Sequence, residues 1–340
     1  MLRLDPSELC IREGDGAPRL AKDEDYASAV LKAWTDEVDG RRGGGDGGGS
    51  VSSPLVYECE TDGSSLHGHV YRPSPPREEG DDAAEEKCVP GIVLFHTGAG
   101  PQDVFLRWKA DSLVNERETF GPEGCVVLIA DIIGDASGWA WHDKERYAEV
   151  RKSILVPDEN GERNKLAGRV RVAVDAVASQ PAVDPDRIGA MGFCLGGHPI
   201  LELARMKDRR VGVMATFHGV FDGVRDLSHV ERSEEADKSK VLVCTGMEDP
   251  FVPHEDLDAA ARMFSDLGVQ GRGDGVRADA ARLHEPGPGL QPERRVRVRR
   301  GGLRAGVVGR SRVFEGHLTL PTDELSLCVG IYAVLCSLGT

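Results

Sequence analysis

The segment Met-Gly-Phe-Cys-Leu-Gly-Gly at 191–197 places Cys194 where an apolar segment changes into a helical one. The residues just before it, RIGAMG at 187–192, are mainly apolar and follow the turn-like Asp-Pro-Asp at 184–186, which predicts a strand in a sheet covered on both faces. Residues 195–206 have the pattern of a helix. The segment therefore predicts a strand that turns sharply into a helix, with a cysteine at the corner.

Gly192 and Gly196 flank Cys194 two residues away on each side. A residue at such a corner is held in a strained backbone conformation, and a Cβ at either flanking position would collide with the turn. The spacing Gly-x-Cys-x-Gly is that of a nucleophile elbow, in which the central side chain is exposed at the end of the strand. We therefore interpret Cys194 as a nucleophile rather than as a buried structural thiol.

The charge balance limits the classes of partner. The 340 residues include 42 Lys and Arg against 57 Asp and Glu, a formal net charge of −15. Nucleic acid and anionic membrane surfaces are bound mainly through excess basic residues, so we expect neither as a partner and expect a small molecule instead. The N-terminal segment has no apolar core behind a basic start, and no apolar run is long enough to span a bilayer, which predicts a cytoplasmic protein.

Composition divides the chain into three parts. Residues 1–50 contain one amphipathic helix at 26–38 and then a Gly-rich linker. Residues 51–270 form the main domain, with an acidic, proline-containing loop at 73–90. From 271 to 340 the sequence becomes rich in arginine and glycine, which is typical of a disordered tail.

The main domain alternates strands and helices. A hairpin at the edge of a sheet is predicted at 55–72. Further strands are predicted at 91–96, 125–132, 187–192, 211–217 and 241–245, and helices at 103–117, 165–179, 195–206 and 255–267. This order predicts an α/β fold with a doubly wound, mostly parallel sheet, helices on both faces and ligands at the carboxyl ends of the strands.

Three strand ends together resemble one known family. They are HTGAG at 96–100, the elbow GFCLG at 192–196 and GMEDPFVP at 246–253, and the resemblance runs from about residue 55 to 267. In this order they resemble the dienelactone hydrolase family of the α/β-hydrolase superfamily. The resemblance implies hydrolysis of an ester, lactone or thioester through a covalent acyl-enzyme and a Cys-His-Asp triad.

Within that resemblance, Cys194 matches the nucleophile and Asp249 the acid that orients the histidine; an Asp at this place could also simply cap a turn. Backbone N–H groups of Leu195 and Gly98 are expected to form the oxyanion hole. The amino end of the helix after Cys194 is expected to lower the thiol pKa, because it stabilises negative charge.

Five further residues are candidates for the pocket. His96 opens the oxyanion loop and is expected to orient it rather than to accept a proton. Thr97 departs from the best-known members of the family, which have a glutamate there that takes part in activating the thiol, so dienelactone itself is in doubt as the substrate. His218 follows a strand and either lines the site or is partly solvated, while Trp139 and Trp141 either border the pocket or pack elsewhere.

The histidine of the triad is missing from its expected context. The family places it after the last strand, within His-Gly-Phe or His-Ala-Phe, whereas 271–310 offers neither that motif nor an apolar run for a closing strand. His198, in the first turns of the helix, is expected to point away from the site, and His284 lies in the wrong context. Read one base out of frame, 281–292 is compatible with HGFTNPAQAFNP, so we predict a frame slip between about residues 267 and 281.

Two functions from different classes follow. The first is an ester, lactone or thioester hydrolase, and the second is a catalytically inactive scaffold or binding protein that keeps the fold without the general base. A serine-type relative is disfavoured by the thiol of Cys194. No cofactor is implied, and no metal either, because His67 and His69 have no Cys or acidic partner at ligand spacing.

Overall fold

The computed structural model describes residues 35, 50–74, 88–134, 144–228, 239–246 and 251–276. The predicted helix at 26–38 lies almost entirely outside the described residues. The strands are β1 Ser50–Cys59, β2 Ser64–Pro73, β3 Val89–Phe95, β4 Val126–Ala130, β5 Val183–Phe193, β6 Val211–Phe217, β7 Lys240–Gly246 and β8 Gln270–Val276.

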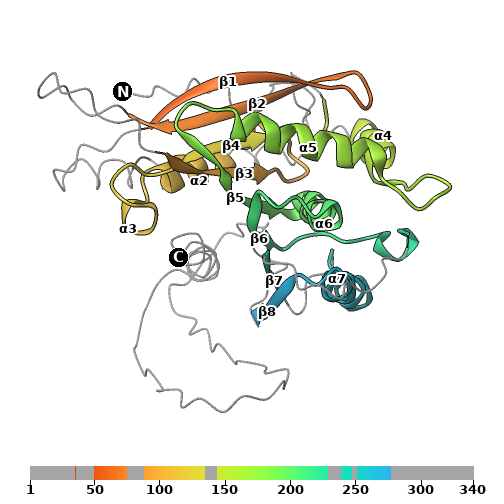
Figure 1. The fold of residues 1–340 in the computed structure, drawn as a ribbon. Helices are drawn as coiled ribbons and strands as arrows, with labels where there is room; N and C mark the ends of the chain where they lie inside the picture. Colours follow the sequence, from red (N-terminus) through yellow and green to blue (C-terminus); the bar gives the residue numbers. More distant parts are fainter. Residues whose placement is uncertain are drawn as a thin grey trace, which may run out of the picture.

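One sheet contains these eight strands in the order β1-β2-β4-β3-β5-β6-β7-β8 (Figure 1). β1 and β2 form an antiparallel hairpin at one edge, and β2 is antiparallel to β4. All pairs from β4 through β3 and β5 to β8 are parallel. The predicted edge hairpin and mostly parallel sheet are therefore confirmed.

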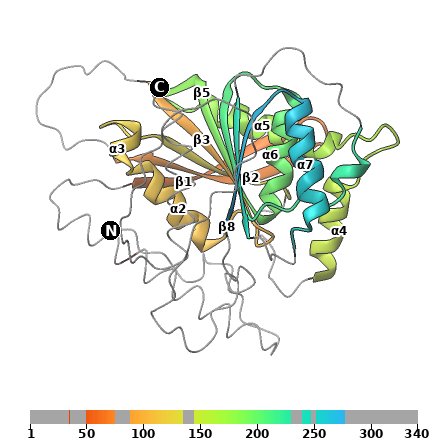
Figure 2. The ribbon, with the colours of Figure 1, turned by 90° about the horizontal axis from the view of Figure 1, so that it is seen from below.

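Helices cover both faces of the sheet, as a doubly wound fold requires. They are α2 Val104–Val114, α3 Arg117–Phe120, α4 Lys144–Leu155, α5 Asn164–Ala178, α6 Gly197–Met206 and α7 His254–Asp266, with short 3₁₀ turns at Cys194–Gly196 and Val224–Asp226. Figure 2 shows α2 and α3 on one side of the sheet and α4, α5, α6 and α7 on the other. The predicted α/β-hydrolase architecture is confirmed.

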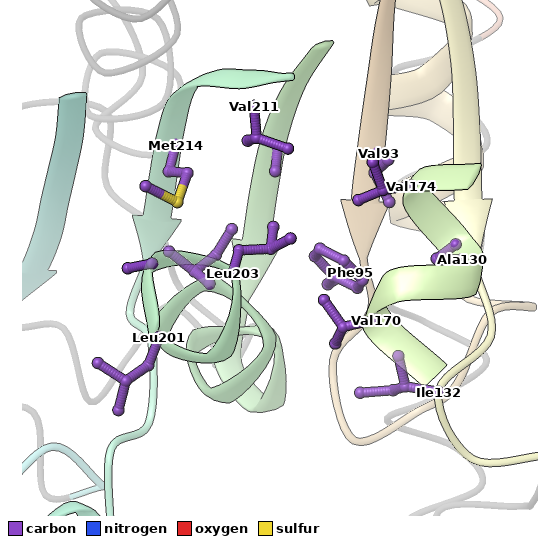
Figure 3. Packing of buried hydrophobic residues seen from close by; sticks show 14 of the residues in the cluster. Val93, Phe95, Ala130, Ile132, Val170, Val174, Leu201, Leu203, Val211 and Met214 are labelled. Carbon is purple, nitrogen blue, oxygen red and sulfur yellow. The ribbon is translucent and has the colours of Figure 1, made fainter. Parts of the chain in front are cut away.

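The core has two layers because successive side chains of a strand point to opposite faces. In β3, Val93 and Phe95 belong to the cluster under α5 and α6, whereas Ile92 belongs to the cluster under α2. Figure 3 shows Val93 and Phe95 facing Val170 and Val174 of α5. Full burial of Phe95 contributes about 2–3 kcal/mol, so the strand that precedes the loop with Gly98 is firmly held.

Three predictions need correction. The sequence predicts no closing strand after residue 271, but β8 pairs in parallel with β7, because strand pairing uses backbone groups and does not require an apolar pattern. Helix α4 is not predicted. The turn predicted at 184–186 lies within β5, where the register with β3 shifts between Val89 and Gly91 and accommodates the extra residues.

Candidate active site

The junction of β5 and α6 is a sharp corner with Cys194 at its tip. Cys194 has φ +52°, in the left-handed region that costs a non-glycine residue about 1–2 kcal/mol. A Cβ on Gly192 would lie 2.1 Å from the carbonyl oxygen of Gly196, and a Cβ on Gly196 would lie 2.6 Å from that of Phe95. Glycine is therefore required at both places, as predicted, so that the corner can close against the end of β3.

Contacts with the neighbouring strand β6 hold this corner. The backbone N–H of Val220 donates to the carbonyl oxygen of Cys194 at 2.9 Å. Below it, the rings of Phe193 and Phe217 stack with centroids 5.1 Å apart. Cys194 is only partly buried, so its thiol lies at a fixed position that solvent can reach.

His218, a predicted pocket candidate, follows β6 directly. It has φ +42°, so the ends of the adjacent strands β5 and β6 each carry a non-glycine residue in the left-handed region. The backbone N–H of His218 donates to Cys244 at 2.7 Å, and the residue is partly buried. Backbone strain of this kind is concentrated at functional sites.

The loop after β3 brings Gly98 to the same edge of the sheet as Cys194, because Phe95 of β3 pairs with Gly192 of β5. His96 is fully buried in this loop; its Nδ1 donates to the carbonyl oxygen of Thr97 at 2.6 Å, and its Nε2 accepts from the N–H of Ile132 at 3.3 Å. Burial lowers the pKa of His96 and keeps the ring neutral. Both nitrogens are engaged, so His96 orients the loop and is not available as a base for Cys194.

Thr97 fixes the loop from the other side. Its hydroxyl donates to Oδ2 of Asp103 at 3.0 Å and accepts from the N–H of Ala99 at 3.1 Å. Asp103 is the N-cap of α2, where Oδ1 accepts from the N–H of Phe105 at 3.0 Å. Thr97 thus connects the loop that contains Gly98 to the start of a helix.

His198 lies in the first turn of α6 and is fully buried. Its Nδ1 accepts from Nη1 of Arg163 at 3.1 Å, and its Nε2 donates to Oδ1 of Asp222 at 3.2 Å. Burial, the largest cause, lowers the pKa of His198 to about 4. With both nitrogens engaged, His198 cannot serve as the base for Cys194, in agreement with the expectation from the sequence.

The carboxylate of Asp222 continues this network to α4. It forms an ion pair with Arg151, and the guanidinium of Arg151 in turn forms a side-chain hydrogen bond with Tyr147 one helical turn earlier. The hydroxyl end of Tyr147 packs against the loop after β3, because a Cβ built on Gly98 would lie 3.0 Å from its hydroxyl oxygen. A Cβ at position 98 would therefore make a tight contact, and the Tyr147 side chain would have to shift by a few tenths of an ångström to admit it.

Residues 82–272 match the dienelactone hydrolase family, a match that covers more than half of the chain. This chain belongs to the dienelactone hydrolase family. Two solved structures agree with the assignment: m3DLH, with 28% identity and a TM-score of 0.51, and the dienelactone hydrolase-like promiscuous phosphotriesterase P91 from metagenomic libraries, with 25% and 0.50. Each alignment covers 66% of this chain and 81% of the other.

A curated relative is the Caenorhabditis elegans protein K02A2.1, which is 31% identical over 105 residues. That alignment covers 31% of this chain, and the chain spans 62% of the length of that relative. Together, family membership and the two similar structures support a hydrolase that acts on ester bonds. Hydrolases of this family act on small molecules, in agreement with the class of partner expected from the charge balance.

Several predicted residues cannot be placed. Asp249, Trp139 and Trp141 lie outside the described residues, as does the segment 277–340 with the predicted frame slip. Among the described residues no group of His, Cys, Asp and Glu side chains could hold a metal ion. None of the helices in the described ranges is long and apolar enough to cross a membrane.

The sequence interpretation missed Tyr147, Arg151, Asp222 and Arg163. The spacing of four between Tyr147 and Arg151 was the available signal, since it places both side chains on one face of a helix. The partner of that face, Asp222, lies 71 residues further along the chain than Arg151, and no local pattern connects them.

Proposed function

We propose that this protein hydrolyses an ester, lactone or thioester of a small molecule, with Cys194 as the nucleophile and a covalent acyl-enzyme as the intermediate. The observation that carries the proposal is the backbone of Cys194, which has a strained φ of +52°. Glycines at 192 and 196 leave room for this sharp turn beside the loop after β3. The chain also belongs to the dienelactone hydrolase family. A corner that is costly in free energy and leaves its thiol accessible suits a nucleophile better than a structural cysteine.

The proposed reaction has two halves. The thiolate of Cys194 attacks the carbonyl carbon and forms a C–S bond, and the carbonyl oxygen becomes an oxyanion that accepts from the backbone N–H groups of Leu195 and Gly98. The C–O or C–S bond to the leaving group then breaks, and the leaving group takes up a proton. Water next attacks the thioester, and its breakdown releases the acid and restores the thiol.

The thiolate is stabilised at the amino end of α6, where backbone N–H groups point toward the corner. Asp249 is proposed as the acid that orients the base, because it comes three residues after β7 in the sequence and matches the acid of the family resemblance. The family resemblance implies a histidine base after the last strand, which 271–310 lacks in that context and the predicted frame slip would restore.

Acylation by p-nitrophenyl acetate tests the proposal. The wild type is expected to release a burst of one p-nitrophenolate per chain, and peptide mapping should find the acetyl group on Cys194. The burst should be lost in Cys194→Ala. Cys194→Ser should retain little of it. The exposed Cys88 is an internal comparison, since it lies outside the corner and should be alkylated by iodoacetamide more slowly than Cys194. Equal acylation in wild type and Cys194→Ala would contradict the proposal and favour the non-catalytic scaffold.

A further inference from the structure

Tyr147 places a phenol hydroxyl beside two parts of the proposed site that are far apart in sequence. Its hydroxyl oxygen would lie 3.0 Å from a Cβ on Gly98 and its ring carbons Cε2 and Cζ 3.2 Å from it, so the hydroxyl end of the ring lies against the loop after β3. The hydroxyl is also close enough to Cys194 for a charge on the sulfur to raise the pKa of Tyr147, after the larger effect of burial. Tyr147 is partly rather than fully buried, so part of its surface is exposed.

Contacts near the end and in the middle of helix α4 hold it against the rest of the protein, which gives the Tyr147 hydroxyl a defined position. Near its end, Nε of Arg163 donates to the carbonyl oxygen of Leu155 at 2.6 Å. In its middle, Arg151 is bound to Asp222, which accepts from His198 in the first turn of α6. Helix α6 directly follows the turn that contains Cys194. The hydrogen bonds among His198, Asp222 and Arg151 therefore fix the position of α4, with Tyr147, relative to Cys194.

The hydroxyl is also chemically suited to donate. Burial and the charge on Cys194 both raise its pKa, so the phenol keeps its proton through the neutral and alkaline range in which a thiolate forms. Its oxygen interacts with the guanidinium of Arg151, and a hydroxyl that accepts from a cation is polarised into a stronger donor.

We propose that the Tyr147 hydroxyl is a third hydrogen-bond donor to the oxyanion that forms when Cys194 attacks a carbonyl, and is therefore a catalytic residue of this site. This inference rests on the proposed function. When the C–S bond forms, the electron pair of the carbonyl π bond moves to the oxygen, and that oxygen accepts from Tyr147 together with Gly98 and Leu195. The proton stays on Tyr147, and the hydrogen bond weakens again when the carbonyl re-forms and the leaving group departs. Arg151 acts through Tyr147 and is a positioning residue.

The test compares acylation by p-nitrophenyl acetate with acylation by its thiono analogue, in which sulfur replaces the carbonyl oxygen. Sulfur is a weak hydrogen-bond acceptor, so donors to the oxyanion favour the oxygen ester and raise the ratio of the two burst rates. Tyr147→Phe removes only the hydroxyl and keeps the ring on Gly98. Tyr57→Phe is the matched control, because the Tyr57 hydroxyl bonds only to the backbone of Asp131, with its oxygen 3.0 Å from the N–H.

Loss of one oxyanion donor lowers the rate by about 100-fold, so the burst rate with the oxygen ester should fall by about that factor in Tyr147→Phe and the oxygen-to-sulfur ratio by at least about 10-fold. The ratio should be unchanged in Tyr57→Phe. A ratio in one sample does not depend on the fraction of folded protein, so partial unfolding of the variant leaves the test decisive. A ratio that changes by less than about 3-fold in Tyr147→Phe overturns the inference.

The two proposals fail in different ways. If the wild type shows no burst, or if the burst persists in Cys194→Ala, the proposed function is wrong and the role of Tyr147 falls with it. If the burst depends on Cys194 and Tyr147→Phe leaves the oxygen-to-sulfur ratio unchanged, only the role of Tyr147 is wrong.

Discussion

Replacement of Gly192 by alanine should break the corner that holds Cys194. The added Cβ would lie 2.1 Å from the oxygen and 2.5 Å from the carbonyl carbon of Gly196, and 2.9 Å from Cγ1 of Ile200. Ordinary contacts begin at 3.4 Å, so the backbone itself must move by more than an ångström. Overpacking against backbone costs about 3 kcal/mol or more, which corresponds to a fall in Tm of roughly 6–12 °C for a domain of this size.

The same movement should also reduce reactivity. A displacement of about 1 Å at a reacting group can cost about 100-fold in rate, so the acylation of Cys194 in Gly192→Ala should fall by about that factor. The assay is thermal unfolding together with the p-nitrophenyl acetate burst. Gly212→Ala in β6 is the matched control, because a Cβ there meets nothing within 4 Å and should be neutral or stabilising by about 0.4–1 kcal/mol. A Tm for Gly192→Ala within about 2 °C of that of Gly212→Ala would refute the argument.

Three further outcomes are expected. Thr97→Val should lower the burst rate about 10-fold, because it removes the hydrogen bond from the loop to Asp103. Thr97→Ser keeps the hydroxyl and should retain most of the burst rate. Equal burst rates in the wild type and both variants would contradict this role of the Thr97 hydroxyl. His198 has its folded pKa lowered from 6.5 to about 4, so it favours the folded state above pH 6.5, and the free energy of unfolding should fall by about 3 kcal/mol as the pH drops from 6.5 to 4. Urea unfolding of His198→Gln should show a shallower pH dependence over that window, and an identical one would exclude His198 as the cause. Sequencing of the transcript across codons 267–281 should reveal a shifted frame, and an unbroken frame identical to the present one would refute the slip.

The sequence predicted strands β1 to β7 and the sharp turn at Cys194 because their signals are local. β3 and β4 are continuous apolar segments between turn residues, and Gly192 and Gly196 flank Cys194 within five residues. The strand bounds differ from the predicted ones by only a few residues, except in β5, where the Asp-Pro-Asp segment is absorbed by an irregular pairing with β3.

Helix α4 escaped prediction because half of its twelve residues are charged. The residues of α4 that pack toward the core are Tyr147, Val150, Ile154 and Leu155. Its role depends on Arg151 meeting Asp222, a contact that only tertiary structure creates. β8 escaped prediction because its segment, with three glycines among seven residues, has no strand pattern. The open edge of β7 nevertheless supplies backbone partners to any extended segment.

The reactivity of Cys194 depends on the register of the parallel pairing between β3 and β5. Phe95 is opposite Gly192, and a slip of two residues between these strands would carry Gly98 about 7 Å along the strand axis away from Cys194. A chain with such a slip would keep its secondary structure and its compactness. The burst amplitude per chain would therefore count only molecules in the native register, which circular dichroism and size-exclusion chromatography cannot distinguish from the slipped form.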